Sequence, residues 1–291
     1  MRPSAAGSLA VALLLACLAA VAGGQAAGER AGVVHVEPSR YAPVVVIEEF
    51  GERCIAFGSS ASGSRQTCVD LDDPKALVFS YTRMMLGALY LQPQPARVLV
   101  IGLGGGTLPT VLAELLPQAQ IDTVEIDPAV VRVAEAWFGF RQGPRQRVHL
   151  QDGRAFVEAA ARAGRRYDLV MLDAYGPDYI PRHLMTREFL QQVKAILAPS
   201  AVVAANTFTA SDMYARESAT YAEVFGPFFN LRANNRVILA VNGTLPDDDA
   251  VRANARALAP RLRPYRVDVE RELLRFSRDR DWPGDALPLA D

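Results

Sequence analysis

The chain has 291 residues, of which 50% are hydrophobic, and its formal net charge at pH 7 is −1. This length fits one large domain, or one domain with a small appendage, and the apolar content is ample for a buried core. Arginines are interspersed with acidic residues rather than clustered, which argues against a nucleic-acid-binding surface, and we expect no nucleic-acid partner.

The amino-terminal segment has the composition of a secretory signal peptide. Arg2 precedes an uncharged apolar stretch over residues 9–22, which has the length of a signal-peptide core and is short for a membrane span. We therefore predict a signal peptide over residues 1–27 and an exported protein, periplasmic or associated with the envelope. A lipoprotein signal with Cys17 as the lipidated residue is the main alternative; an uncleaved anchor or a misassigned start are others. We expect membrane contact only through this segment.

Residues 33–72 have the pattern of a small antiparallel β-hairpin unit. Four short runs, VVHV, VVVIEEF, RCIAF and QTCVDL, are separated by turn-forming residues. Cys54 and Cys68 lie on the last two runs. They could pair across the hairpin in an oxidising compartment, or remain two buried thiols.

A helix is predicted to follow this unit. Its start is expected at residues 72–74, because Pro74 suits the first turn of a helix, and its end near Pro93.

The chain is organised around residues 97–127. An apolar run typical of a strand buried on both faces leads into the glycine-rich turn GLGGG at residues 102–106, and a helical pattern follows. A second apolar run ends at Glu125, where an acid can accept hydrogen bonds from ribose hydroxyls. The spacing is not GxGxxG, so we predict a site for one adenosyl group rather than for NAD. A tight turn without a ligand is the alternative.

Strands and helices then alternate to residue 245. We expect helices from residue 128, after residue 153, and over 186–197 and 212–224, and strands over 147–150, 167–172, 201–205, 230–233 and 236–241. This alternation predicts an α/β fold, a Rossmann-like and mostly parallel sheet with helices on both faces and an antiparallel strand late in the order. Residues 246–291 are expected to form one more helix and a charged tail.

Four polar residues stand at the predicted carboxyl ends of strands, where ligands bind in open α/β sheets. Glu125 would hold a ribose. Asp152 could accept from an adenine amino group, or simply cap the following helix. Asp173 follows a fully apolar strand and is the strongest catalytic candidate, and Asn206 is a candidate ligand contact.

The loop after residue 173 carries further candidates. His183 could act as a general base, or could cap or pack against the following helix. Tyr175 and Tyr179 flank the predicted site and could cover it. No group of histidine, cysteine and acidic residues has metal-ligand spacing, so we expect no metal.

Four segments in order, VLVIGLGGGTL, VEID, QDGRAF and YDLVMLDAYGP, resemble the spermidine synthase (polyamine aminopropyltransferase) family. The upstream segment DDPKALVFSYTRMML resembles the tyrosine-containing active-site helix of that family, and the resemblance covers roughly residues 44–241. It implies a fold shared with S-adenosylmethionine-dependent methyltransferases. It also implies decarboxylated S-adenosylmethionine or S-adenosylmethionine as co-substrate, a small-molecule amine or other small acceptor, and a homo-oligomer formed through the amino-terminal strands.

The resemblance assigns roles to individual residues. Tyr81 would orient the acceptor amine and Asp173 would be the catalytic acid–base residue. The nucleoside site would comprise Gly102, Gly104, Gly105, Glu125, Asp152 and Gly153. Such a reaction needs a base, because the attacking amine must be neutral although its solution pKa lies near that of lysine, about 10.

Three positions depart from the family pattern. Gly104 or Gly105 stands where the family has an aspartate, and the motif Asp-Ser-Ser-Asp-Pro reads DAYGP at residues 173–177. Thr82 and Arg83 stand where the family usually has a glutamine or histidine followed by glutamate. An arginine beside a diamine pocket would oppose the binding of a cation.

The leading hypothesis is a transferase of this family that binds an S-adenosyl-type sulfonium nucleoside. A methyltransferase on the same fold, with Arg83 as a partner for the donor carboxylate, is the second hypothesis. A non-catalytic nucleoside-binding protein of the envelope is the third. We expect four regions: the signal peptide over residues 1–27, the β unit over 33–72, the catalytic domain over 73–245, and the helix and tail over 246–291.

Overall fold

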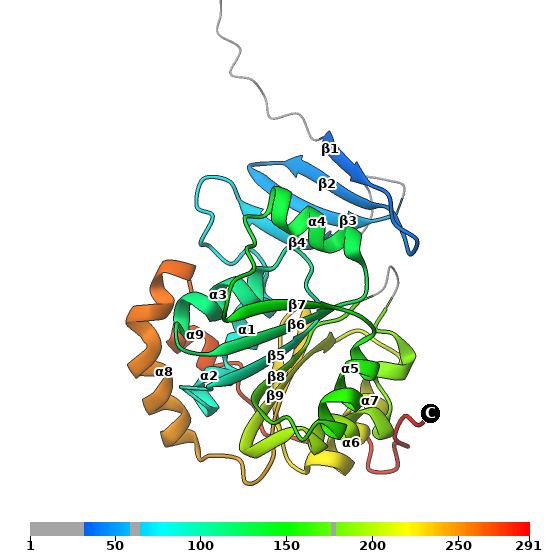
Figure 1. Cartoon of the computed structure of the whole chain (residues 1–291). Helices are drawn as coiled ribbons and strands as arrows, with labels where there is room; N and C mark the ends of the chain where they lie inside the picture. The colour runs from blue at the N-terminus through cyan, green and yellow to red at the C-terminus, as the bar shows by residue number, and fades with distance from the viewer. Residues whose placement is uncertain (1–31, 59–64, 176–178) are drawn as a thin grey trace, which may run out of the picture.

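The computed structural model describes residues 32–58, 65–175 and 179–291. The predicted signal peptide and the alternative lipid site at Cys17 lie outside these residues. Two β-sheets organise the described chain: a four-stranded sheet in the order β1-β2-β3-β4, and a seven-stranded sheet in the order β10-β11-β9-β8-β5-β6-β7 (Figure 1).

The four-stranded sheet, called here the amino-terminal sheet, is antiparallel throughout, as predicted. Its strands are β1 (Gly32–Glu37), β2 (Val44–Glu49), β3 (Glu52–Phe57) and β4 (Arg65–Asp70). Cys54 and Cys68 lie directly opposite each other on β3 and β4 and form a disulfide, which decides between the two alternatives left open by the sequence.

The seven-stranded sheet confirms the predicted α/β fold. Strands β5 to β9 run parallel, and β11 is antiparallel to its neighbours. From β5 the chain builds β6 and β7 on one side and then crosses to β8 on the other, so the strand order reverses between β5 and β8. The strands are β5 (Arg97–Ile101), β6 (Gln120–Glu125), β7 (Gln146–Leu150), β8 (Tyr167–Leu172), β9 (Leu197–Phe208), β10 (Phe229–Arg232) and β11 (Asn235–Val241).

Helices cover both faces of the large sheet, and alternate residues of β5 point into the two resulting cores. Val98 and Val100 belong to the core on one face, whereas Leu99 and Ile101 belong to the other. The first core is covered by α1 (Ser80–Leu86), α2 (Ala88–Leu91), α3 (Thr107–Leu115), α8 (Asp248–Leu262) and α9 (Val269–Leu273). The second is covered by α5 (Gly153–Arg162), α6 (Arg187–Ala195) and α7 (Tyr214–Phe225). Two short 3₁₀ helices, η1 (Arg182–Leu184) and η2 (Arg263–Tyr265), complete the described elements.

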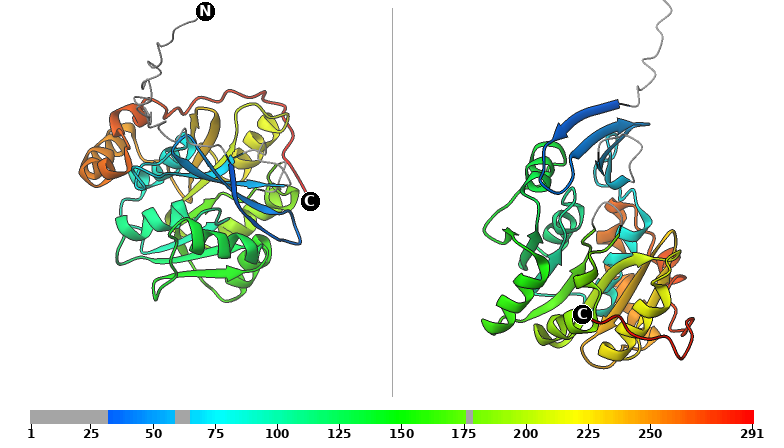
Figure 2. Two further views of the ribbon diagram at one scale, coloured as in Figure 1. Left: turned by 90° about the horizontal axis from the view of Figure 1, so that it is seen from above. Right: turned by 90° about the vertical axis from the view of Figure 1, so that its right-hand side faces the viewer.

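Helix α4 (Pro128–Trp137) joins the two sheets. Its apolar face packs with Val44, Val46 and Ile55 of the amino-terminal sheet. Figure 1 shows α4 in front of β3 and β4, and the right view of Figure 2 shows the amino-terminal sheet at one end of the molecule. The small sheet is therefore docked on the Rossmann-like unit through a shared apolar core.

The predicted start of the first helix, at residues 72–74, is wrong. The Asp70 carboxylate accepts hydrogen bonds from the N–H groups of Asp72 and Asp73, and Leu77 bridges back to Val69 of β4. These contacts close a turn against the amino-terminal sheet, so helix α1 begins only at Ser80.

Two other predicted boundaries also differ. The strand expected over residues 201–205 extends from Leu197 to Phe208, because β11 pairs with it as far as Phe208. Asn206 therefore lies inside β9 rather than beyond its end, and α6 stops at Ala195 to make room for the strand. Among residues 32–58, 65–175 and 179–291, no helix combines the length and apolarity needed to cross a membrane.

Removal of the disulfide should lower stability. The Cys54–Cys68 bond closes a loop between residues 14 positions apart, and loops of this size are worth about 3 kcal/mol by chain entropy. We expect Cys54→Ala/Cys68→Ala to lose about that free energy of unfolding in urea titrations. Wild-type protein unfolded with a reductant present should match the double variant, and an unchanged midpoint in both would contradict the prediction.

Candidate active site

A cavity of about 620 Å³ lies at the carboxyl ends of the central strands, where the strand order reverses. This volume is that of an ordinary small-molecule site. The loops after β5, β6, β7 and β8 form one side, and residues of the amino-terminal sheet and α1 form the other. The position is the one at which open α/β sheets bind their ligands.

The cavity brings together most of the residues that the sequence singled out. Those that line it are Tyr81, Gly102, Gly104, Glu125, Asp152, Gly153, Asp173, Tyr175, His183 and Asn206. Gly105 lies just behind this lining, where its N–H points to Thr67. Tyr179 is also set back, and its hydroxyl bonds Ser211 and Glu217 instead.

Glu125 is held rigidly at the end of β6. One carboxylate oxygen accepts from the N–H of Leu103 at 3.0 Å, and the other from the N–H of Asp127 at 2.9 Å. Burial raises the pKa of Glu125, and these N–H groups partly offset the rise. The carboxylate thus fixes the glycine loop and keeps lone pairs that could accept from ribose hydroxyls.

Asp152 caps α5, as one of its two predicted roles required. Its Oδ1 accepts from the Ala155 N–H at 3.0 Å, and its Oδ2 lies 2.8 Å from Nε2 of His183. Burial alone would raise the pKa of Asp152, but the Ala155 N–H and the His183 ring outweigh it and the net pKa is lowered. His183 lies in η1 and pairs with Asp152, a contact that the sequence did not predict, and its two predicted roles stay predictions.

Asp173 has the most perturbed acidity in the cavity. Asn206 donates from Nδ2 to Asp173 Oδ1 at 2.8 Å, and Asn235 in turn donates to Asn206 at 3.1 Å. The Tyr81 hydroxyl, which donates to the carbonyl oxygen of Gln66 at 3.4 Å, lies close enough to the Asp173 carboxylate to lower its pKa as well. Burial nevertheless dominates and raises the pKa of Asp173 from 3.8 to about 7. A carboxylate with this pKa can both accept and release a proton near neutral pH.

Gly102 makes the approach of β8 to the glycine loop possible. Its φ is +101°, and a Cβ there would lie only 2.2 Å from the carbonyl oxygen of Asp173. No other residue fits this position without moving Asp173.

Arg83 does not approach the cavity, and the expectation that it opposes a cation there is wrong. Its Nη1 donates to the carbonyl oxygens of Leu77 and Val78, and its Nε lies 3.8 Å from Glu272 of α9. Helix α1 turns Tyr81 toward the cavity and Arg83 to a different side. Arg83 is equally unsuited as a partner for a donor carboxylate.

The amino-terminal sheet contributes lining residues that sequence reasoning missed. They are Tyr41, Phe57, Arg65, Gln66 and Thr67. None of them lies in a recognisable motif, and the sheet was expected to be a separate unit. Asn235 at the start of β11 also carried no local signal.

The cavity is acidic. Glu125, Asp127, Asp152 and Asp173 line it, and the permanent cation among its described lining residues is Arg65, which pairs with Glu52 at 2.6 Å. The aromatic side chains Phe79, Tyr81, Tyr175 and Phe208 also line it. This combination of carboxylates and aromatic faces suits a positively charged ligand.

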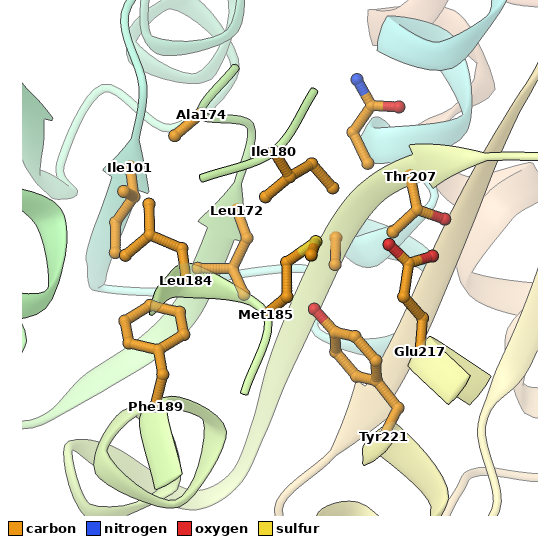
Figure 3. A pocket seen from close by; sticks show the side chains of 12 residues that line it. Ile101, Leu172, Ala174, Ile180, Leu184, Met185, Phe189, Thr207, Glu217 and Tyr221 are labelled. Atoms are coloured by element: carbon orange, nitrogen blue, oxygen red, sulfur yellow. The ribbon is translucent and has the colours of Figure 1, made fainter. Parts of the chain in front are cut away.

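A second, much smaller cavity of about 20 Å³ lies beside Ala174 and Ile180 (Figure 3). Figure 3 shows the Glu217 carboxylate and the Tyr221 hydroxyl on one side, facing apolar residues such as Leu184 and Met185. Its volume holds about one water molecule. Glu217 accepts a hydrogen bond from the Tyr179 hydroxyl at 3.0 Å and lies near the charge of Arg236.

Metal ligation finds little support among the described residues. The one cluster of suitable side chains there is Glu52 with Cys54 and Cys68, and both sulfurs are engaged in the disulfide.

The fold and cavity define a Rossmann-like nucleoside-binding protein of the transferase type. The model of the spermine/spermidine synthase domain matches residues 78–229. A polyamine aminopropyltransferase of Vibrio vulnificus is 42% identical over 265 residues, which cover 89% of this chain and 88% of that protein. The chain therefore belongs to the spermine/spermidine synthase family and is a transferase, and the predicted family is confirmed.

Solved structures agree on the fold. A probable spermidine synthase from Corynebacterium glutamicum superposes with a TM-score of 0.67 at 20% identity, covering 89% of this chain and 97% of that one. Human methyltransferase-like protein 13 in complex with SAH has a TM-score of 0.57 at 27% identity, covering 71% and 96%. The homo-oligomer implied by the resemblance stays a prediction.

Replacement of Asp173 by Asn should make the protein more stable at neutral and alkaline pH, because it removes a buried acid with a raised pKa. Because its folded pKa of about 7 exceeds the ordinary 3.8, the unfolded chain releases the proton first and stability falls as pH rises from about 4 to 7. Asp173→Asn removes this loss, so we expect a gain of a few kcal/mol at pH 8 that shrinks toward zero near pH 4. Thermal unfolding across this range measures it; Asp168→Asn, at a position outside the cavity, is the comparison. A pH-independent difference would contradict the raised pKa.

Proposed function

We propose that this protein transfers an aminopropyl group from decarboxylated S-adenosylmethionine to a small amine. The observation that carries the proposal is the environment of Asp173, a carboxylate with a pKa of about 7 at the centre of an acidic, aromatic-lined cavity. The similarity to the Vibrio vulnificus polyamine aminopropyltransferase supports the same reaction.

In this reaction a neutral amine attacks the carbon next to the sulfonium. A carbon–nitrogen bond forms, the carbon–sulfur bond breaks, and methylthioadenosine leaves as a neutral thioether. Asp173 takes the proton from the amine, and Asn206 holds the carboxylate in place. The Tyr81 hydroxyl lies beside this carboxylate. A base with a pKa near the working pH fits this role.

The other end of the cavity would hold the nucleoside. Glu125 would accept from the ribose hydroxyls, and Asp152 would accept from the adenine amino group; Gly102, Gly104 and Gly153 line the same end of the cavity, with Gly105 behind them. Both carboxylates are fixed by backbone N–H groups, so they need no rearrangement on binding.

The charge of the cavity favours the decarboxylated donor. This molecule carries a sulfonium and an ammonium group, whereas S-adenosylmethionine adds a carboxylate. Arg65, the permanent cation among the described lining residues, is already paired with Glu52. Methyl transfer is the second candidate, because human methyltransferase-like protein 13 shares the fold at 27% identity in a complex with SAH.

The test is a calorimetric and thermal-shift titration of the chain from residue 28 with four ligands: S-adenosylmethionine, its decarboxylated form, S-adenosylhomocysteine and methylthioadenosine. A ligand at a hundred times its Kd should stabilise by about 2.7 kcal/mol. Preference for the decarboxylated donor and methylthioadenosine supports the proposal. Preference for S-adenosylmethionine and S-adenosylhomocysteine favours methyl transfer. If none of the four ligands binds, both proposed reactions are contradicted.

Turnover provides the second readout. With putrescine as the amine, methylthioadenosine release should rise with pH through an apparent pKa near 7, because the base must be ionised. Asp173→Asn should lower kcat at least 10²-fold while the affinity for methylthioadenosine changes little. Full turnover in that variant would remove Asp173 from the mechanism and favour a non-catalytic role for the carboxylate.

We also propose that the protein is exported. The disulfide between Cys54 and Cys68 supports this, since such bonds persist in oxidising compartments, and so does the signal-like composition of residues 1–27. Cell fractionation with amino-terminal sequencing of the mature protein is the measurement. Recovery of an uncleaved, reduced protein from the cytosol would contradict the proposal, and a lipid on Cys17 would identify the lipoprotein alternative.

A further inference from the structure

Thr67 of β4 contacts the glycine loop directly, although the loop follows β5 of the other sheet. Its side chain is 7% exposed, and its Oγ1 accepts a hydrogen bond from the N–H of Gly105 at 3.2 Å. The same residue lines the large cavity. The hydroxyl that accepts from Gly105 keeps its own O–H donor for another partner.

The fit between Thr67 and the loop is tight. A Cβ at residue 104 would lie 2.5 Å from Thr67 Oγ1, and a Cβ at residue 105 would lie 2.6 Å from Thr67 Cγ2. Both glycines therefore accommodate Thr67, and no side chain at either position is compatible with its present place. The methyl group packs against the loop while the hydroxyl anchors it.

The strand that carries Thr67 is paired within its own sheet on one side only, with β3. β4 is an edge strand, and its pairing with β3 is irregular between Ile55 and Ala56, the residues opposite Thr67 and Arg65. On its other side, within the described chain, it makes one isolated bridge, Val69 to Leu77.

The disulfide adds a covalent link to the pairing of β4 with β3. Cys68, the residue after Thr67, is bonded to Cys54 of β3. β3 is itself fixed to the Rossmann-like unit, because Ile55 belongs to the core shared with α4 and Arg53 donates to the carbonyl oxygen of Trp137. The disulfide therefore ties β4, which contacts the glycine loop through Thr67, to the firmly held strand β3.

We propose that Thr67 is a positioning residue for the glycine loop of the donor site and that the Cys54–Cys68 disulfide acts on donor binding through it. The proposal rests on the function proposed above in that the loop belongs to the nucleoside site. In an oxidising compartment the disulfide would then both stabilise the protein and hold the glycine loop in the form that binds the donor.

Substitutions at residue 67 separate the two contributions of the side chain. Thr67→Val keeps the shape and removes the acceptor for the Gly105 N–H; it should weaken methylthioadenosine binding about ten-fold, as expected for one buried donor left unsatisfied. Thr67→Ser keeps the acceptor and should bind within about three-fold of wild type, on the same reasoning. Thr123→Val is the matched control, since Thr123 is fully buried in β6 and its hydroxyl has no partner in the described structure.

A double-mutant cycle tests the link to the disulfide. Cys54→Ala/Cys68→Ala should weaken methylthioadenosine binding several-fold in the wild-type background and not at all in Thr67→Val, measured well below the unfolding temperature of each variant. Wild type treated with a reductant should behave as the cysteine variant. Additive losses would show that the disulfide acts by another route and would overturn that half of the proposal.

Hydrogen exchange of the ligand-free protein gives a readout that does not depend on the proposed function. Peptides that contain the Gly105 amide should exchange about ten-fold faster in Thr67→Val, as expected for the loss of one hydrogen bond, and unchanged in Thr67→Ser and Thr123→Val. If wild type binds none of the four nucleosides but shows this pattern, the proposed function fails and the positioning role stands. Equal exchange and equal binding in Thr67→Val and wild type would overturn the role of Thr67.

Discussion

The site depends on the close contact between Gly102 and Asp173. β5 and β8 pair in parallel, and the Asp173 N–H donates to the carbonyl oxygen of Ile101 at the end of β5. A Cβ at residue 102 would collide with the Asp173 backbone. Because a glycine stands there, the loop proposed to hold the nucleoside and the acid proposed to accept the proton share one cavity.

Around that contact, the carboxyl groups of Asp152, Glu125 and Asp173 have different pKa values because their surroundings differ. Asp152 is partly solvated and held by an N–H and by His183, and its pKa is lowered. Glu125 is buried and its pKa rises. Asp173 is buried with fewer compensating donors, and its pKa reaches about 7. Environments that separate the pKa values of neighbouring acids also separate their roles, which supports ligand holding at one end of the cavity and proton transfer at the other.

The amino-terminal sheet is part of this site rather than an appendage. It is fixed through the core that it shares with α4, and it supplies Gln66 and Thr67 to the cavity. The position where the resemblance expects an acid is a glycine, and Thr67 occupies the adjacent space. The side chain beside residues 104 and 105 is therefore that of Thr67 from the neighbouring strand, and Arg83 is not among the described residues that line the cavity.

The sequence by itself determined the alternation of strands and helices, the glycine turn, and the acids Glu125, Asp152 and Asp173 at strand ends. These are local features, since a buried strand, a tight turn and a helix cap are each encoded by residues close together in the chain. Tertiary structure decided the start of α1, because the competing turn needs β4 as a partner. It also decided the direction of Arg83, the pairing of His183 with Asp152, the disulfide, and the contact of Thr67 with the glycine loop. Each of these depends on contacts between residues that are separated in the chain, and no pattern within a single segment records them.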